Sequence, residues 1–523
     1  MDTKKIQQMK AKIGTMFIVI LLGILCLGMF SHTMTTPPGP DEQMYITAST
    51  LVQKNLLYKD FAFAQMPYLP LFYGLVYKLT GISYYLLLGR LISYLFIIIS
   101  MLLIYLLAYR LSKDRTFSLC LLFVFTLNRI TIYVASYSWN AVIPIALSLA
   151  GLYAFILSVS ETRPKQIGIF CSGFFLALAV GIKLYYAVLL LPFFIVSLLY
   201  PTSLRLKKRI IYVLLPLVSG IALGLLPALY YLIKDAHNFI FNNFSFHIAA
   251  RNWYSITGYT ESMDIISKIK YLIIVLCYYP TNTTLCIGFF FIFLAIAKGI
   301  KAGNGQFLKQ LLQRDSLLLT LMVFLTLITV AFMKPLQFSY FALPFPFIIA
   351  MLACLFAAIP AKGKDRVRLI FIYLVALYFI LSGGGLIKDS INLADRNHWA
   401  GIYVHRVAEN IRESIGPVPG GKIATLAPLY IVESGLPIYN ELATGPFLYR
   451  FGDYIPEDTR KRIVLTSPQN LNGLFKEEAP RAILVGFWPK WESAFIRYAE
   501  ENNYVKIKKD FNGGTLYVRK DTY

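Results

Sequence analysis

The feature that most constrains the fold of this chain is a succession of apolar segments, many of them close to the roughly 20 residues that span a bilayer. Hydrophobic residues make up 57% of the 523 positions and charged residues only 15%, whereas a soluble domain carries about 25% charged residues. The sequence therefore predicts an α-helical polytopic membrane protein. Hydropathy places about eleven transmembrane helices at residues 12–32, 84–109, 116–135, 140–160, 167–182, 184–201, 209–233, 271–297, 316–333, 337–359 and 368–386.

The basic residues predict the orientation of these helices. The net charge is +23, and Lys and Arg gather in alternate short loops, as is typical of the cytoplasmic side of a membrane protein. We therefore expect a multi-pass plasma-membrane protein with a cytoplasmic N-terminus. No aromatic-and-basic module that would bind nucleic acid is visible. The predicted membrane domain covers residues 1–389, with outer loops at 32–83 and 234–270, and the tail at 390–523 is predicted to be extracytoplasmic.

The first outer loop and the tail both contain secondary-structure signals. In the loop, apolar residues from Met44 to Leu56 recur at helical spacing, and a second apolar stretch runs from Pro67 to Gly81. These patterns predict two amphipathic juxtamembrane helices lying in the membrane interface. The tail is predicted to be a small α/β domain that acts as a scaffold or binds an acceptor. Its expected strands lie at 422–427, 481–487, 504–510 and 514–520, and its expected helix at 491–503.

The most informative short motif is GPDEQMY at residues 39–45, which places Asp41 and Glu42 directly after the first predicted span. One interpretation is that these acids only begin a helix, because Pro suits the first turn and acidic residues favour the helix N-terminus. The other is that one carboxylate is a general base that removes a proton from an acceptor hydroxyl. The two interpretations are compatible, since a helix start would hold the side chain in place.

Several motifs in order resemble the C-type glycosyltransferase (GT-C) superfamily, of the protein O-mannosyltransferase and aminoarabinose transferase kind. The resemblance covers about the first 360 residues, and the tail matches only in position. The matching stretches are PDEQMYITASTLVQKNLLYKDF (40–61), MPYLPLFYGLVYKLTG (66–81), LGRLISYLF (88–96), LALAVGIKLYYAVLLLP (176–192) and FSYFALPFPFIIA (338–350).

The resemblance implies a GT-C fold and a sugar donor carried on a polyprenyl phosphate. It implies an inverting single displacement onto a glycan, lipid or protein acceptor. The Asp of the first-loop pair is the base in relatives, which implies this role for Asp41 and an orienting role for Glu42. Many relatives carry a second acid near the start of the fourth span, where this chain has Asn140. Tyr340 occupies the position at which relatives place a Tyr near the lipid phosphate.

A departing polyprenyl phosphate needs cations, because stabilisation of developing charge is a large part of catalysis. The candidates are Arg90, Lys183, Arg251 and Lys334. Arg90 and Lys183 could instead extend to lipid head groups, and Tyr340 could be an interface anchor. His247 precedes Arg251 by one helical turn and is more typical of a hydrogen-bonding residue than of a catalyst. Trp253 and Tyr254 would either stack on a sugar or anchor the loop.

No cofactor is expected. The six cysteines all lie in apolar runs without metal-ligand spacing, and the Asp-Glu pair has no acidic or His neighbour, so no metal site is predicted. Two other functions stay open. A polytopic lipid or polysaccharide transporter or flippase would show internal repeats or acids near the bilayer midplane, which are not visible here. A non-catalytic membrane scaffold would not need Asp41 at all.

Overall fold

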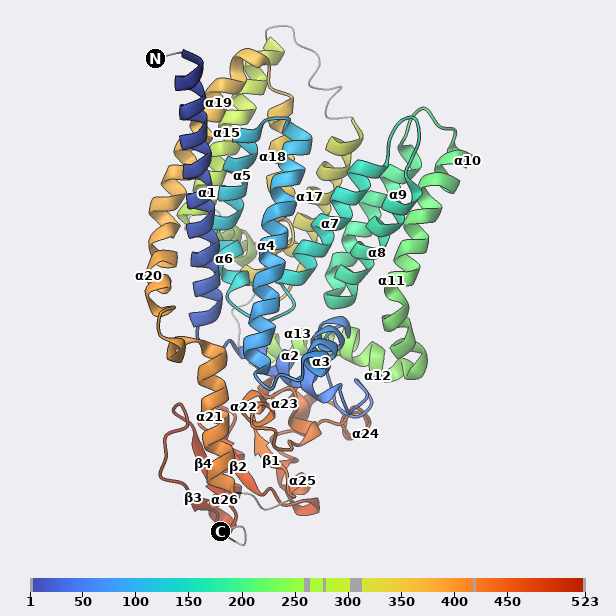
Figure 1. Ribbon diagram of the computed structural model, residues 1–523. Coiled ribbons are helices and arrows are strands. Elements are labelled where there is room, and N and C mark those ends of the chain that lie inside the picture. Colours follow the sequence, from blue (N-terminus) through green and yellow to red (C-terminus); the bar gives the residue numbers. More distant parts are fainter. Residues whose placement is uncertain (1–2, 258–263, 276–278, 302–312, 417–419, 521–523) are drawn as a thin grey trace.

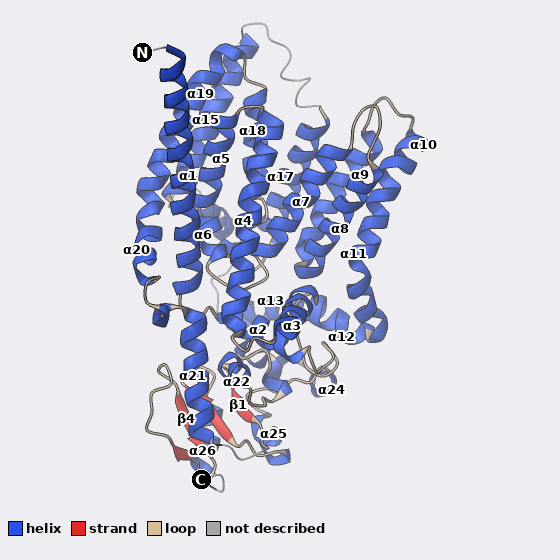
Figure 2. Cartoon of the chain, in the orientation of Figure 1, coloured by secondary structure: helices blue, strands red, loops and turns tan. Residues whose placement is uncertain are grey.

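The computed structural model describes the whole chain except residues 1–2, 258–263, 276–278, 302–312, 417–419 and 521–523. A long helical part and a smaller part that contains a sheet are stacked end to end (Figures 1 and 2). The N-terminus lies at the free end of the helical part, and the C-terminus lies at the opposite end of the molecule (Figure 1). Pieces of the predicted second outer loop and of the predicted span at 271–297 fall outside the described residues.

Within the described residues, seven helices are long and apolar enough to cross a membrane, or eight if one bent pair is a single span. The chain is therefore a multi-pass membrane protein; the predicted count of about eleven spans stays a prediction. The long helical segments are α1 (Thr3–Thr35), α4 (Tyr85–Ser112), α10–η2–α11 (Leu206–Arg209, Ile210–Leu214, Leu215–Lys234), α15 (Pro280–Lys301), α17 (Arg314–Phe332), η5–α18 (Phe338–Ala342, Phe345–Ala357) and α19–η6–α20 (Ala361–Tyr378, Phe379–Gly383, Gly384–Asn392).

The remaining apolar helices match the other predicted segments in order. The bent pair has an angle of 56° and consists of α5 (Arg115–Leu127) and α6 (Arg129–Ala135). The shorter ones are α7 (Val142–Ser158), α8 (Gln166–Ile182), η1 (Leu184–Leu189) and α9 (Leu190–Leu199). One boundary was wrong: the span predicted at 271–297 is α15, which begins only at Pro280, whereas Tyr271 belongs to the separate α14 (Ile265–Ile273). Pro suits a first helical turn, so it begins a new helix here.

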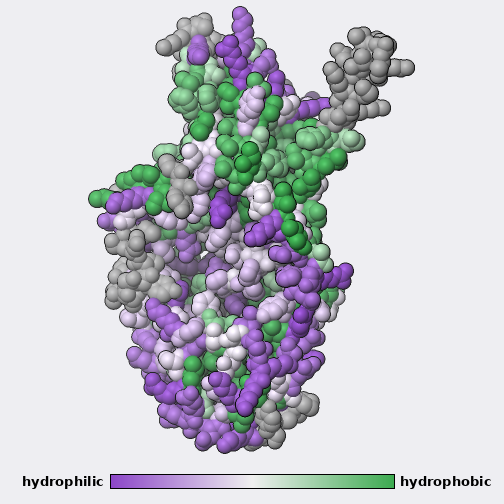
Figure 3. All heavy atoms as spheres, turned by 90° about the vertical axis from the view of Figure 1, so that its left-hand side faces the viewer, coloured by the Kyte–Doolittle hydropathy of each residue, from purple (hydrophilic) through white to green (hydrophobic). Residues whose placement is uncertain are grey.

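The surface of the helical part is the one expected in lipid. Most of its exposed large hydrophobic side chains lie on the long helices, whereas the described residues after position 400 contribute only Tyr454 to this set. Figure 3 shows hydrophobic surface over the helices and a mostly hydrophilic surface over the sheet-containing part. Inside the bundle, α8 and α11 approach closely at Gly173 and Gly220, where an added β-carbon would lie 2.1 Å and 2.0 Å from a facing carbonyl oxygen. Small residues of this kind let membrane helices touch along their backbones.

The two helices predicted in the first outer loop are present as α2 (Pro40–Leu51) and α3 (Tyr68–Thr80). Only α3 keeps exposed apolar side chains, at Leu75 and Leu79. The expectation that both lie in the membrane interface was wrong for α2, because residues 42–49 are all buried. This helix packs between α3, α4 and a helix of the C-terminal part (Figure 1).

The C-terminal part, residues 393–520, contains the predicted strands and helix. Its four-stranded sheet has the order β1-β2-β4-β3, with β1 parallel to β2 and the other pairs antiparallel. The register pairs Ile423 with Ala482 and Ile483 with Tyr517. The elements are η7 (Arg396–His398), α21 (Ala400–Ile415), β1 (Ile423–Thr425), α22 (Pro428–Glu433), η8 (Asn440–Leu442), α23 (Pro446–Tyr449), η9 (Gly452–Tyr454), α24 (Glu457–Arg462), α25 (Leu471–Glu477), β2 (Ala482–Val485), α26 (Ser493–Glu501), β3 (Val505–Lys506) and β4 (Thr515–Val518).

Polar and aromatic contacts fix the C-terminal part against the helical part. The Leu429 N–H donates to Gln43 Oε1 of α2 at 3.1 Å, and the Leu86 N–H donates to Glu433 Oε1 at 2.7 Å. The second outer loop forms α12 (Ala236–Ile240), η3 (Phe241–Ser245) and α13 (Phe246–Thr257). Its Trp253 packs edge-on against Phe451, with ring centroids 4.7 Å apart. These contacts hold the C-terminal part directly over α2 and α13.

Candidate active site

The start of α2 determines where the two predicted acids point. Pro40 occupies the first turn, and Glu42 accepts a hydrogen bond from the Gly39 N–H at 2.7 Å through Oε2. This contact is the carboxylate half of a capping box. Glycine is needed at position 39 because an added β-carbon would lie 2.7 Å from the Tyr137 ring. The cap therefore holds Glu42 in a buried position, whereas the neighbouring Asp41 lines the cavity described below.

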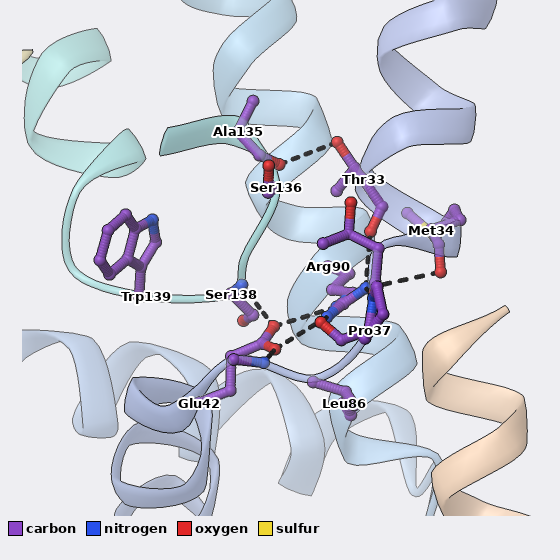
Figure 4. A network of polar contacts seen from close by, with 12 residues as sticks. Thr33, Met34, Pro37, Glu42, Leu86, Arg90, Ala135, Ser136, Ser138 and Trp139 are labelled. Atoms are coloured by element: carbon purple, nitrogen blue, oxygen red, sulfur yellow. Dashed lines mark hydrogen bonds and ion pairs between the residues drawn. The ribbon is translucent and has the colours of Figure 1, made fainter. Parts of the chain in front are cut away.

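Glu42 forms a buried ion pair with Arg90 of α4, and both side chains are 0% exposed. The Arg90 Nε donates to Glu42 Oε1 at 3.0 Å and Nη2 donates to Oε2 at 2.8 Å. The Ser138 N–H, at 2.7 Å, also donates to Oε1. Arg90 Nη1 donates to the carbonyl oxygens of Thr33 and Thr36 at the end of α1 (Figure 4). One bidentate pair thus joins α1, α2, α4 and the loop before α7.

This geometry gives Glu42 and Arg90 a structural position. Neither residue lines the cavity described below, and the guanidinium group of Arg90 donates to Glu42 and to backbone carbonyls. A direct contact of Arg90 with a lipid phosphate does not fit this position, and neither does its extension to lipid head groups. Glu42 holds the start of the helix that carries Asp41; the orienting role implied by the family resemblance stays a prediction.

A cavity of about 780 Å³ lies between the helical part and the C-terminal part. It is lined by seven of the nine site residues predicted from the sequence. They come from α2, from the loop before α7, from the turn after α8, from α13 and from the connection between α17 and α18. These residues are Asp41, Asn140, Lys183, His247, Arg251, Lys334 and Tyr340. Segments more than 290 residues apart in the sequence therefore converge on one chamber at the end of the bundle that faces the C-terminal part (Figure 1).

Asp41 and Lys183 form the electrostatic centre of this cavity. Burial raises the pKa of Asp41 to about 6, and the positive charges of Lys183 and Arg450 oppose the rise. Burial lowers the pKa of Lys183 to about 8, and the charge of Asp41 opposes the fall. Lys183 lies in the turn between α8 and η1, is 7% exposed, and its Nζ sits 5.1 Å from the centroid of Tyr185 and 6.0 Å from that of Tyr340. Lys183 therefore faces the acid from an aromatic cage rather than extending to lipid head groups.

The other predicted residues differ in exposure. Arg251 and Lys334 are exposed to the cavity, and Tyr340 is half-buried. Asn140 is buried, and its Nδ2 donates to Gln65 Oε1 at 3.2 Å. His247 also lines the cavity. Partial removal of water from around its ring lowers its pKa below the ordinary value. A neutral imidazole at pH 7 can donate or accept a hydrogen bond, which suits the polar role expected for it.

Five residues of the C-terminal part also line the cavity, and the sequence patterns indicated none of them: Pro446, Phe447, Arg450, Phe451 and Trp488. Two of these side chains, Arg450 and Trp488, carry hydrogen-bond donors. Arg450 follows α23, and Trp488 follows β2. No motif surrounds either residue, so no local signal marked them. Of the two aromatic residues considered beforehand, Tyr254 lines the cavity, whereas Trp253 is 3% exposed and packs against Phe451. Trp253 thus anchors the loop to the C-terminal part.

A second, smaller cavity of about 370 Å³ shares Asp41 with the first. Trp139 and Gln337 also line both cavities. Aromatic side chains dominate its described lining, which comprises Gly39, Pro40, Asp41, Tyr133, Tyr137, Trp139, Tyr271, Leu336, Gln337 and Phe338. Asp41 therefore stands at the junction of a chamber that contains Lys and Arg and a chamber that is mainly aromatic.

The overall fold has a counterpart among solved structures. This chain superposes on ArnT from Cupriavidus metallidurans in the apo state with a TM-score of 0.60 and 10% sequence identity. The superposition covers 97% of this chain and 98% of the ArnT chain. It matches the same protein bound to undecaprenyl phosphate with a TM-score of 0.60, 11% identity, and 96% and 98% coverage. No family model and no curated protein matches the sequence. The chain has the fold of ArnT, an aminoarabinose transferase, so the resemblance drawn from its motifs is confirmed at the level of the fold.

Proposed function

We propose that this protein is a membrane glycosyltransferase that takes a sugar from a polyprenyl-phosphate donor. The observation that carries the proposal is the position of Asp41 in a cavity that also contains Lys183, Arg251 and Lys334. A carboxylate with a pKa of about 6 is ionised at pH 7 and is a stronger base than an ordinary Asp. The fold shared with ArnT, which has been solved with undecaprenyl phosphate, supports a lipid-phosphate donor.

The proposed reaction is a single displacement that inverts the anomeric carbon of the sugar. Asp41 accepts the proton of the acceptor hydroxyl as its oxygen forms a bond to that carbon. The bond between the carbon and the phosphate oxygen breaks, and its electron pair leaves with the polyprenyl phosphate. Lys183, Arg251 and Lys334 stabilise the departing phosphate, as fixed charges do most effectively in a site shielded from water. Tyr340, beside Lys183, adds a hydroxyl donor.

Three further residues complete the proposed site. Glu42 positions Asp41 through the cap of α2, and Asn140 and His247 offer neutral polar contacts to the substrates. The side-chain cations supply the positive charge that a metal ion would otherwise provide, so we propose that no metal cofactor is required. The acceptor is a glycan, lipid or protein, and we place the reaction on the outer face of the plasma membrane.

The positions of the charged residues favour a transferase over a transporter or flippase. A transporter would hold its ionisable residues near the bilayer midplane between repeated halves. Here the cavity residues lie on α2, on α13 and on connections at the end of the helices, next to the C-terminal part (Figure 1). A non-catalytic scaffold would not need a carboxylate and a lysine facing each other in a cavity.

Transfer by the purified full-length protein tests the proposal. The donor is undecaprenyl phosphate carrying the labelled sugar that is missing from cells without the protein, and the acceptor is membranes from those cells. We expect label to move to the membranes, and we expect the same rate with EDTA present. Absence of transfer with the wild-type protein would contradict the proposed function, whereas loss of transfer with EDTA alone would contradict only its metal-independent form.

The pH dependence of transfer should be bell-shaped. Activity should fall below about pH 6, because the raised pKa of Asp41 means that the base becomes protonated there. It should fall again above about pH 8, because the lowered pKa of Lys183 means that its positive charge is lost. Initial rates between pH 4.5 and about 9.5 measure both limbs. In Lys183→Arg the side chain stays charged throughout, so the alkaline limb should disappear; an unchanged alkaline limb would exclude Lys183 as its source.

A further inference from the structure

The described lining of the larger cavity carries more positive charge than one lipid phosphate needs. Four Lys and Arg residues line it, against the single carboxylate of Asp41, which leaves three positive charges in excess. A phosphodiester donor brings one negative charge, and a departing phosphate monoester brings about 1.5 to 2 at neutral pH. Even with the departing phosphate bound, about one positive charge remains unbalanced. Concentrated like charges in a site of low dielectric are unfavourable unless a ligand neutralises them.

The four cations come from two parts of the molecule. Lys183, Arg251 and Lys334 belong to the helical part, and Arg450 alone belongs to the C-terminal part. Arg450 is held in an aromatic setting on the C-terminal side of the cavity. Its guanidinium lies 4.8 Å from the ring centroid of Phe451, and its Nη2 donates to Tyr254 Oη at 2.8 Å. Its charge also acts on the pKa of Asp41, so Arg450 lies within electrostatic range of the base.

Trp488 provides a second, independent sign of a ligand on the same side. It follows β2, at the carboxyl end of a strand paired in parallel with β1, where α/β sheets commonly bind ligands. Its indole N–H is buried and has no hydrogen-bond acceptor among the described residues. Trp488 lines the cavity. A buried donor without a partner is costly, and an oxygen atom of a bound molecule would satisfy it.

From these contacts we infer that Arg450 and Trp488 form an acceptor subsite that binds an anionic group, a phosphate or a carboxylate, next to the nucleophilic oxygen. This inference rests on the proposed function and adds the class of acceptor. Arg450 binds the anion, since guanidinium groups match the geometry of both phosphate and carboxylate. Trp488 donates its N–H to an acceptor oxygen and offers a flat face to a sugar ring. The C-terminal part is then a component of the active site.

Steady-state transfer kinetics test this assignment. The amount of acceptor membranes and the concentration of the undecaprenyl-phosphate donor are varied separately. Arg450→Met should raise KM for the acceptor on the order of tenfold or more and leave the donor KM unchanged. Its kcat should fall only toward acidic pH, because the pKa of Asp41 rises when the charge of Arg450 is removed. Arg450→Lys should restore part of the loss. Trp488→Phe keeps a ring and removes the N–H, so it should also raise the acceptor KM, by a smaller factor. Arg497→Met, on the exposed face of α26 and outside the cavity, is the matched control and should behave as wild type.

Binding of undecaprenyl phosphate, measured without acceptor, distinguishes the cations assigned to the donor phosphate from Arg450, which is assigned to the acceptor. Because only folded protein should bind this lipid, the same measurement shows whether a variant is folded. Arg251→Met should weaken this binding on the order of tenfold, and Arg450→Met should leave it unchanged. If Arg450→Met weakens the binding of undecaprenyl phosphate as much as Arg251→Met does, Arg450 belongs to the donor site and the inference is wrong. Wild-type kinetics in both Arg450→Met and Trp488→Phe would also overturn it, while wild-type transfer would still support the proposed function.

The structure of the product distinguishes the two sources of the anion. Tandem mass spectrometry of the labelled product identifies the residue that receives the sugar. A phosphate on that residue or its direct neighbour assigns the subsite to phosphate, and a carboxylate there assigns it to an acidic glycan or peptide. An acceptor without any anionic group near the new bond would overturn the inference.

Discussion

Asp41→Asn should reduce sugar transfer about 10²–10⁴-fold, because the variant has no group that can accept the acceptor's proton. The protein should remain folded. The pKa of Asp41 is higher in the folded state than the ordinary value, so at pH 7 its negative charge has a higher free energy in the folded than in the unfolded protein. Removing that charge should leave the stability unchanged or raise it slightly. Transfer rates and the midpoint of thermal unfolding of the purified protein measure the two effects together.

The control for Asp41→Asn is Asp458→Asn, an exposed acid on α24. It should retain wild-type activity and stability. Binding of undecaprenyl phosphate to Asp41→Asn should persist, since the side chains assigned to the phosphate are intact. If Asp41→Asn transferred sugar within a few-fold of wild type, Asp41 would be only a helix start, and another group would have to serve as the base.

Arg90→Met, unlike Asp41→Asn, should lower the free energy of unfolding by about 3–5 kcal/mol. It would leave the Glu42 carboxylate buried without its cation and would remove the donors to the last carbonyls of α1. Breaking one side of a buried pair costs this much because the remaining charge cannot reach water. Denaturant titration of the protein in detergent measures the change. Activity should fall as well, because Glu42 fixes the start of the helix that carries Asp41.

Arg110 offers a matched control, since it is exposed in the last turn of the same helix, α4. Arg110→Met should change stability by no more than about 0.5 kcal/mol. The double variant Glu42→Gln/Arg90→Met should be less destabilised than the sum of its single variants, because neither charge is then left alone. If Arg90→Met unfolded at the same denaturant concentration as wild type, the pair would not hold the four segments together.

Much of the fold was predictable because apolar run length and strand pattern are local signals. Helices occur at the predicted apolar segments, and α2, α3 and the strands of the sheet occur where expected, whereas the number of membrane spans stays a prediction. The prediction was wrong where a distant contact decides the outcome. The sequence of α2 resembles an interfacial helix, but the C-terminal part covers it and buries residues 42–49. α15 begins later than predicted because Pro280 starts a new helix. A hydropathy average over a window does not show where a helix begins within an apolar segment.

The candidate site shows the same division. Asp41 and Lys183 stand out locally, because each is an ionisable residue at the end of an apolar segment. Arg90 also stands out, but hydropathy cannot distinguish an arginine that binds a ligand from one that is paired with a buried acid. That distinction required the position of Glu42, 48 residues away. Arg450 and Trp488 carry no local signal, and only the packing of the C-terminal part brings them to the cavity.

The most direct test of the account is the composition of glycans and lipids in cells that carry the wild-type protein, no protein, or Asp41→Asn at an equal level. We expect deletion and Asp41→Asn both to lose the same sugar modification, and the missing sugar then identifies the donor. If deletion removes the modification while Asp41→Asn retains it at the wild-type level, the central role given to Asp41 is wrong. A transporter or scaffold would then explain the protein better.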